Sequence, residues 1–523
     1  MIFLPFFQHF RPRKVIRAPE KGNDEIVNVA EFSLKTTSAF HKTGDLLLRE
    51  VPVGNAPVAV FCFIDSLSDK LLLEQDIVAP VCAHAEELFT LPSEGEDTSP
   101  ESEAASAMRE RLLSSLSFCQ DVVVLSLEEG RGKIAEGDVA LFAEGYDCLF
   151  MFSQRKAEKR AIAEPPTATV LKGPREGFIE EIKTNTALIR RRIRSPDLVF
   201  ENLSVGRYSV TPVTIAYIHG VADPEVVDRV REKLNAVDID GVTDGACLAP
   251  FLEERKNSFF KQVGNSEKPD VVAAKLLEGR VAVITDGSPI VLTLPFLLLE
   301  DMQDGYDYYS GDWRASLARV FRVLGAALTV LLPAGYVALQ SYHFHLLPTE
   351  FLITLAGATS SIPFPPAAEM LFVLLLFEIL NEASMRMPRY LSVSLSIVGA
   401  IVLGDTAVKA GLISSPAVLV TALSSIGIFC VPDQVGTLSI LRLLFLLASA
   451  VLGLFGMIAL LAVTTGYLAS VQNYGAPYFA PYAPRIRSDL KDGVWKASVT
   501  HMDSRPLSFP NQNRTRQKQE DDE

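Results

Sequence analysis

The C-terminal part of the chain consists of long apolar runs, whereas short apolar runs alternate with polar stretches in the N-terminal part. Residues 323–349 contain no Lys, Arg, Asp or Glu, and a run of that length can cross a bilayer as a helix. Pro333 is expected to kink this helix. Further runs with little or no charge follow at 351–368, 370–377, 390–404, 410–432 and 443–484. The pattern predicts a C-terminal α-helical polytopic membrane domain with roughly four to six spans.

Two passages of the N-terminal part repeat each other. Residues 58–69 (VAVFCFIDSLSD) and 213–224 (VTIAYIHGVADP) are both apolar, strand-like runs that end in a short turn before a helical pattern. Further along, residues 136–151 and 278–293 each read as a β-hairpin, because a Glu-Gly or Asp-Gly pair interrupts two strand-like runs.

The two matched pairs occur in the same order, which indicates duplication of one unit. We therefore predict an α/β soluble N-terminal half made of two duplicated subdomains with hairpins and helices. The second hairpin is expected to turn through two residues, Asp286-Gly287, with a positive φ at the glycine. The predicted domains are 1–166 (first cytoplasmic α/β subdomain), 167–312 (second), 313–484 (transmembrane helices) and 485–523 (basic cytoplasmic tail).

A segment of distinct character, residues 173–198 (GPREGFIEEIKTNTALIRRRIRSPDL), lies at the start of the second subdomain. Pro174 suits a first helical position and Pro196 a stop, so the pattern predicts a single helix over 174–194. Its apolar stripe consists of Phe178, Ile182, Ile189 and Ile193.

Acids lie in the first half of this segment and bases in the second half. The arrangement complements the helix dipole, and it also suits contact with lipid phosphates or an acidic partner. We interpret the segment as a coupling helix between the cytoplasmic domains and an assembly, with the candidate residues Gly173, Pro174, Arg175, Glu176, Arg190, Arg191 and Arg192.

The same segment resembles a known signature. GPREGF followed by TNTALIRRRIRSPDL is similar to the signature of spore germination receptor A-type subunits, the GerA/SpoVAF family, and residues 363–388 and 397–415 resemble the acidic membrane helix of that family and the segment after it. Leu374 replaces a further Glu that many members carry. Asp405 stands where many receptor subunits show Gln, which favours the SpoVAF branch.

The resemblance implies a multi-pass protein of the spore inner membrane, with the N-terminal half and the tail in the cytoplasm. It further implies an oligomeric channel that releases cations when nutrient germinants are sensed. The implied partners are further copies of the chain, a transporter-like B-type subunit and a lipoprotein C-type subunit, or another membrane partner in the SpoVAF branch. A non-conducting scaffold or signal relay is the alternative, and a secondary transporter is a third hypothesis.

Acidic residues within the apolar runs are functional candidates, because a carboxylate is costly in hydrocarbon. The pore or membrane candidates are Glu369, Glu378 and Asp405. On a straight helix Glu369 and Glu378 point about 180° apart, so one helix cannot present both to one lumen. We expect Glu369 on the pore or subunit-facing side, with a hydrogen-bonded structural role as the alternative. Glu382 is expected to pair with Arg386 four residues later.

Basic residues flank the membrane part, with Arg314, Arg319 and Arg322 before it and Arg485 and Arg487 after it. The positive-inside rule therefore places both soluble ends in the cytoplasm, which requires an even number of crossings. If residues 350–361 crossed as well, Arg386 and Arg389 would lie outside, contrary to the same rule; the sequence leaves both arrangements open.

Composition excludes several other functions. The formal net charge of −14 argues against nucleic-acid binding. Six cysteines without a CxxC pair favour reduced thiols over a disulfide framework or a zinc site. No arrangement of catalytic residues can be recognised, so we expect no enzyme activity, no cofactor and no metal; membrane lipid remains an expected partner.

Overall fold

The computed structural model describes residues 28–53, 56–89, 98–116, 121–153, 172–386 and 406–517. The chain divides into two compact units, of which the first comprises residues 1–36, 47–63 and 68–154 and the second comprises 37–46, 64–67 and 155–523. The short segments 37–46 and 64–67 thus belong to the second unit. The predicted domain limits at 166, 312 and 484 stay predictions.

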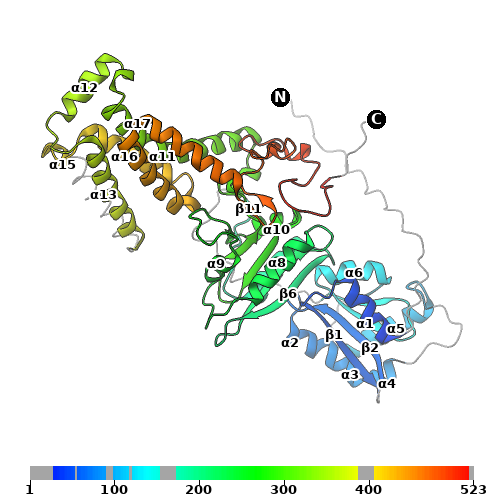
Figure 1. Ribbon diagram of the computed structural model, residues 1–523. Coiled ribbons are helices and arrows are strands. Elements are labelled where there is room, and N and C mark those ends of the chain that lie inside the picture. The colour runs from blue at the N-terminus through cyan, green and yellow to red at the C-terminus, as the bar shows by residue number, and fades with distance from the viewer. Residues whose placement is uncertain are drawn as a thin grey trace, which may run out of the picture. The chain divides into compact units, whose positions relative to one another are not determined.

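The first unit is built on a five-stranded sheet with the strand order β1-β2-β4-β5-β3 (Figure 1). Its strands are β1 (Leu46–Val53), β2 (Ala56–Ile64), β3 (Val122–Leu125), β4 (Val139–Ala143) and β5 (Leu149–Phe152). Its helices are α1 (Val29–Ala39), α2 (Lys70–Leu73), α3 (Ala79–Ala83), α4 (Ala85–Leu88), α5 (Glu103–Ser115) and α6 (Leu127–Glu136).

The second unit contains a five-stranded sheet with the equivalent order β6-β7-β9-β10-β8. Its strands are β6 (Leu198–Val205), β7 (Thr211–Ile218), β8 (Gly264–Ser266), β9 (Val281–Thr285) and β10 (Val291–Leu294). The helices around it are α7 (Ile182–Arg192), α8 (Pro224–Asn235), α9 (Ala249–Leu252) and α10 (Pro269–Leu277). The two passages that repeat in the sequence form β2 and β7, and the two hairpins form β4–β5 and β9–β10, so the shared topology is what a duplicated subdomain predicts.

Side chains of the second sheet alternate between two apolar clusters, as the twofold period of a strand requires. On β9, Val281 and Val283 pack with α8, whereas Ala282 and Ile284 pack with α7 and α10 on the opposite face. This sheet is therefore buried on both sides. The predicted apolar stripe of the 173–198 segment lies in the second cluster, which contains Phe178, Ile189 and Ile193, with Ile182 packed against it.

The hairpin β9–β10 confirms the positive φ of Gly287, which is 80°. The predicted length of its turn is wrong, because β9 ends at Thr285 and β10 begins at Val291. Hydrogen bonds to distant residues hold the longer loop: the amide of Gly287 donates to the carbonyl of Glu180 at 2.7 Å, and the amide of Asp286 donates to the carbonyl of Pro212 at 3.0 Å.

The predicted single helix over 174–194 is also wrong at its start, because α7 begins at Ile182. The Asp286 carboxylate accepts a hydrogen bond from the Ile182 amide at 3.1 Å and so satisfies one free N–H group of the first turn. The Asn185 side chain bonds both the amide and the carbonyl of Ile179, at 2.9 and 2.6 Å, which holds the preceding residues outside the helix.

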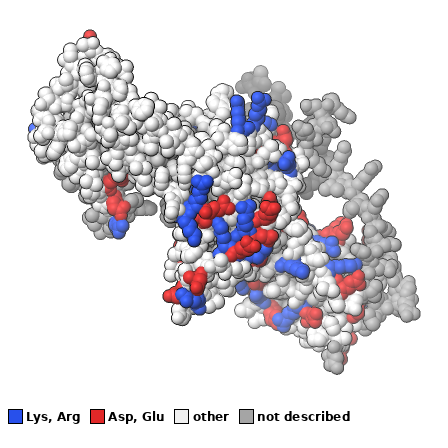
Figure 2. All heavy atoms as spheres, in the orientation of Figure 1, with Lys and Arg blue, Asp and Glu red and all other residues white. Residues whose placement is uncertain are grey.

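The C-terminal helices are α11 (Asp312–Ser341), α12 (Thr349–Thr359), α13 (Pro366–Arg386), α15 (Ala407–Lys409), α16 (Ser415–Ile428) and α17 (Val435–Ser470). Two described helices, Asp312–Ser341 and Pro432–Ser470, are long and apolar enough to cross a membrane. The first of them continues through Pro333. On the face drawn in Figure 2, the helical region is almost free of charged side chains, whereas acids and bases gather over the sheets.

Helix α17 consists of two arms that fold back on each other at Gly453, whose φ of 62° and ψ of −144° are not helical. In a straight helix, Thr437 and Tyr467 would lie about 45 Å apart. Instead, Thr437 Oγ1 donates to the carbonyl of Phe259 at 3.0 Å and the hydroxyl of Tyr467 donates to Ser258 Oγ at 3.2 Å, so both arms end at one loop of the sheet subdomain. We call this end of the helices the sheet end.

The opposite, far end lies where α11 finishes, because the Tyr342 hydroxyl donates to the carbonyl of Ala450 at 2.7 Å, close to the reversal at Gly453. Helix α13 runs from the far end towards the sheet end. Its Met370 and Leu374 pack beside Leu446 of the first arm, and its later residue Glu378 contacts Arg442, which precedes Leu446 along that arm.

The apolar run at 443–484 is helical only as far as Ser470. Beyond it the chain forms the short hairpin β11 (Gln472–Asn473) and β12 (Ala476–Pro477), which packs on the sheet subdomain. Asn473 Nδ2 donates to the carbonyls of Gln262 and Phe296, and the Tyr474 hydroxyl donates to the carbonyl of Leu252. Two of the aromatic residues of this stretch, Tyr474 and Tyr478, are therefore fully buried core residues.

We expect the substitution Gly287→Ala to loosen the β9–β10 hairpin. The nearest atom to an added Cβ is the Thr243 carbonyl oxygen at 4.0 Å, so space is available and the loss comes from the positive φ, at about 1–2 kcal/mol. Hydrogen exchange should become faster in β9 and β10.

Gly132→Ala in α6 is the matched control, because nothing lies within 4 Å of its added Cβ. An alanine inside a helix should leave exchange unchanged or slow it. Equal exchange in β9 and β10 for wild type and Gly287→Ala would contradict the structural role of the turn.

Candidate functional site

The residues predicted to couple the soluble part to an assembly do not form one surface. Gly173 lies against the ring of Tyr309, which an added Cβ would approach to 2.7 Å. Pro174 and Arg175 precede the helix, and Arg175 is exposed. Glu176 is paired instead with Arg192 of α7, at 2.7 Å.

Arg190 is fully buried, which its place in a run of three arginines did not indicate. Its guanidinium donates to both carboxylate oxygens of Asp45 at 2.8–3.1 Å and to the carbonyl of Ser195 at 3.1 Å. It also lies 5.0 Å from the centre of the Phe200 ring. Arg190 therefore fixes the segment 37–46 to the second subdomain, and its buried guanidinium is not placed to contact lipid phosphates; its coupling role stays a prediction. Arg191 is half-buried at the end of α7.

A second buried arginine, Arg319, connects the base of α11 with two other parts of the unit. Its Nε lies 3.1 Å from Asp307 of the sheet subdomain, and its Nη1 lies 2.8 Å from Asp492 of the C-terminal tail. The same nitrogen donates to the carbonyl of Gly493 at 2.7 Å. Arg322, one turn later, donates to both oxygens of Asp307 at 2.7 and 3.0 Å. We call these residues the Arg319 cluster.

The carboxyl of Asp307 is 1% exposed, and burial alone would raise its pKa. Hydrogen bonds from Arg322, the Asp304 amide and Arg319 outweigh burial and hold the pKa below its usual value of 3.8. The folded pKa is thus lower than the unfolded one. The stabilisation by this carboxylate is present above the usual pKa and is lost as the pH falls through the folded value.

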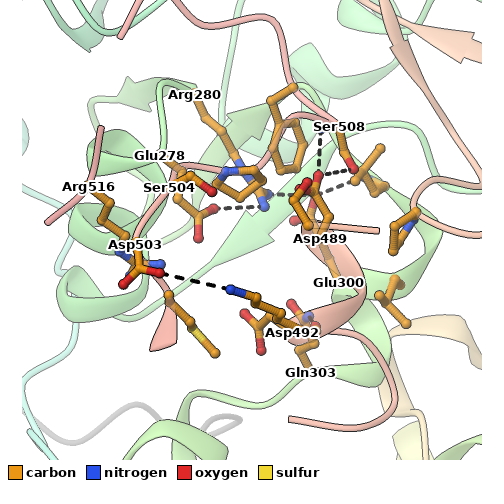
Figure 3. Close-up of a pocket in the computed structure, with 18 residues that line it drawn as sticks. Glu278, Arg280, Glu300, Gln303, Asp489, Asp492, Asp503, Ser504, Ser508 and Arg516 are labelled. Carbon is orange, nitrogen blue, oxygen red and sulfur yellow. Dashed lines mark hydrogen bonds and ion pairs between the residues drawn. The ribbon is translucent and has the colours of Figure 1, made fainter. Parts of the chain in front are cut away.

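The C-terminal tail contributes to a small cavity of about 70 Å³ on the sheet subdomain (Figure 3). The sheet subdomain contributes Arg280, which pairs with Glu278 at 3.1 Å and with Glu300 at 2.6 Å. Asp489 of the tail accepts hydrogen bonds from the amides of Leu507 and Ser508. Burial raises the pKa of Glu278, whereas Arg280 and Lys275 lower that of Glu300 against the effect of its burial. Arg280 thus neutralises the acids beside it, and Asp489 binds the backbone of the tail itself, so the cavity marks a docked tail.

The two candidate acids on α13, Glu369 and Glu378, differ sharply in their surroundings. Glu369 is 1% exposed, and its Oε1 accepts the amide of Ser414, the N-cap residue of α16, at 2.5 Å. In this structure its carboxylate stabilises the start of α16, and its expected place on the pore side stays a prediction. Asp405 lies outside the described residues.

Glu378 pairs with Arg442 of the first arm of α17. The Arg442 side chain is 4% exposed and also donates to Ser424 Oγ of α16 at 3.2 Å, whereas the Glu378 side chain is 37% exposed. The predicted pair of Glu382 with Arg386 is confirmed at 2.6 Å. Sequence reasoning missed Arg442; the signal was available, because it is a single arginine inside a long apolar run. Among the described residues, no group of His, Cys, Asp or Glu is arranged to hold a metal ion.

We expect Arg190→Met to destabilise the second subdomain by about 3–5 kcal/mol, because Asp45 would remain buried without its partner. The melting temperature of the full chain in detergent reports this loss. Arg194→Met is the control, since it removes the same charge from an exposed side chain two residues after α7. Equal melting temperatures of the two variants would show that the buried pair is unimportant.

Comparisons with known proteins agree with the signature at residues 173–198. Spore germination protein KA of Bacillus subtilis (strain 168) is 32% identical over 515 residues, which cover 98% of this chain and 90% of that protein. Spore germination protein A1 of the same organism is 34% identical over 384 residues, which cover 73% and 80%. A crystal structure of the N-terminal domain of the A subunit of the Bacillus megaterium spore germinant receptor GerK3 matches 51% of this chain and 94% of its own, with 24% identity and a TM-score of 0.37.

A sequence model of one family matches residues 35–508, which is most of the chain. The resemblance inferred from the residues is thereby confirmed. The chain belongs to the Bacillus/Clostridium GerA spore germination protein family.

Proposed function

We propose that this chain is a membrane subunit of a spore germination receptor and that it conducts cations past Glu378 in an oligomer. The observation that carries the proposal is the side chain of Glu378, which is 37% exposed on α13 beside the exposed apolar side chains of Leu375 and Ile379. A carboxylate is costly against lipid, so its exposed edge requires water or a neighbouring protein. Arg442 fixes the carboxylate from the buried side.

The helix directions support an arrangement in the membrane. Each arm of α17 is about 26 Å long, close to the thickness of the hydrocarbon layer, and α13 is slightly longer. In this arrangement α11, α13 and both arms of α17 cross the membrane. Helix α16 lies between these helices. Both ends of α17 then lie on the side of the sheet subdomain, which is the cytoplasmic side.

The direction of α13 also favours one of the two arrangements that the sequence left open for the side of the membrane on which Arg386 lies. Because α13 runs towards the sheet end, Arg386 at its end lies towards the cytoplasm, as the positive-inside rule asks. Helix α12 is then too short to cross, since its 11 residues span about 16 Å. It lies at the far end without a crossing of its own.

The exposed edge of Glu378 favours self-association, because a second copy would cover it or would enclose a water-filled path beside it. Assembly with a transporter-like B-type subunit and a lipoprotein C-type subunit belongs to the same proposal. The Arg319 cluster supplies the mechanical connection through which the soluble part would act on α11.

The test is cation flux through the purified full-length protein in liposomes. Glu378→Gln removes the carboxylate charge and should lower flux by about tenfold or more, a barrier change of ~1.4 kcal/mol. Glu382→Gln is the control on the same helix, because its pair with Arg386 is largely exposed and its loss should leave flux nearly unchanged.

Two outcomes would contradict the proposal. Equal flux in wild type and Glu378→Gln would remove Glu378 from the conduction path. A folded, membrane-inserted wild type without flux, alone or with its partner subunits, would favour the non-conducting relay.

A further inference from the structure

The two tryptophans of the chain lie together at the base of α11. Trp313 is in the first turn of α11, whereas Trp495 is in the C-terminal tail, and their ring centres lie 5.0 Å apart in an edge-to-face arrangement. Trp313 is 78% exposed and Trp495 is 55% exposed. Two large aromatic side chains from distant parts of the sequence thus form one exposed patch, which we call the tryptophan pair.

Polar contacts beneath the pair hold the tail against the helix. Lys496 Nζ lies 2.5 Å from Asp312, and the Lys496 side chain is 1% exposed. The amide of Lys496 donates to Ser316 Oγ at 3.0 Å. Because the residue next to Trp495 is locked in this way, the exposure of the indole results from a defined packing of the tail on α11.

The apolar surface continues from the pair along the helix. Exposed side chains recur on α11 at Leu317, Phe321, Leu324 and Leu328, spaced three or four residues apart on one face. This stripe joins the tryptophan pair to the part of α11 that is proposed to lie in hydrocarbon. Arg319 and Arg322, which would interrupt it, point instead into the Arg319 cluster.

The length of α11 matches a bilayer with its headgroups. Its 30 residues span about 45 Å, and a bilayer with both headgroup regions is about 40–45 Å thick. Tyr342 directly follows the other end of the helix. Tryptophan and tyrosine are the residues enriched at both membrane–water boundaries, where one edge of the ring is apolar and the other can donate a hydrogen bond.

We infer that the tryptophan pair binds the headgroup region of the cytoplasmic leaflet and that the C-terminal tail is consequently a membrane-surface element. This inference rests on the proposed crossing of the bilayer by α11. The exposed guanidinium of Arg314, the neighbour of Trp313, suits lipid phosphates at the same level. The sequence predicts the tail only as a basic cytoplasmic extension.

The test measures tryptophan fluorescence, which comes from this pair alone because the chain has two tryptophans. Full-length protein is placed in phosphatidylcholine and phosphatidylglycerol vesicles that carry a bromine label either near the headgroup or near the end of the acyl chain. Trp313→Phe then reports on Trp495 alone, and Trp495→Phe on Trp313 alone. Wild type gives the summed signal of the pair if either variant folds poorly.

The expected result is a loss of fluorescence from both tryptophans that is greater with the shallow label than with the deep one, together with weak quenching by aqueous iodide. Strong quenching by iodide without any effect of the lipid labels would overturn the inference, because the pair would face water. Insensitivity to all quenchers would overturn it in favour of a protein partner, either a second copy or another subunit.

Extraction with alkaline carbonate separates this inference from the proposed function. Protein that is stripped from the vesicles would overturn the crossing by α11 and the inference with it. Protein that resists extraction but leaves its tryptophans open to iodide would overturn the inference alone.

Discussion

The connection between the soluble part of the second unit and its helices depends on the charges around Arg319. A buried charge is stable only where it is paired, and for Arg319 one acid comes from the sheet subdomain and the other from the C-terminal tail. Asp307 in turn binds Arg322. The base of α11, the loop before it and the tail after the last helix must therefore fold together, since any one of them alone would leave a buried charge unpaired.

Sequence patterns predicted the features that arise within short stretches of chain. The strand runs and the apolar stripe of α7 depend on the spacing of neighbouring residues, and the equivalent strand orders of the two sheets agree with the repeated passages. The start of α7 could not be predicted in this way. It is set by Asp286, which is 104 residues away and caps the helix from another hairpin.

The same limit applies to the helical region. Neither the reversal at Gly453 nor the return of residues 471–484 to the sheet subdomain changes the hydropathy of the long apolar run at 443–484. Both depend on contacts with the loop at Ser258 and with the Gln262 carbonyl, which are remote in sequence. Of the acids that hydropathy singled out, the structure buries Glu369 and gives Glu378 a cation from α17.

The fold-back of α17 limits how this helix can move. Its two arms end on adjacent residues of one loop, so neither arm can slide along its axis without the other. A displacement of that loop would move both arms together as one rigid body. The reversal at Gly453, at the far end of this body, lies against Tyr342. A shift of the soluble subdomain would thus displace the end of α11 at the far end of the helices. This displacement needs no conformational change within either arm.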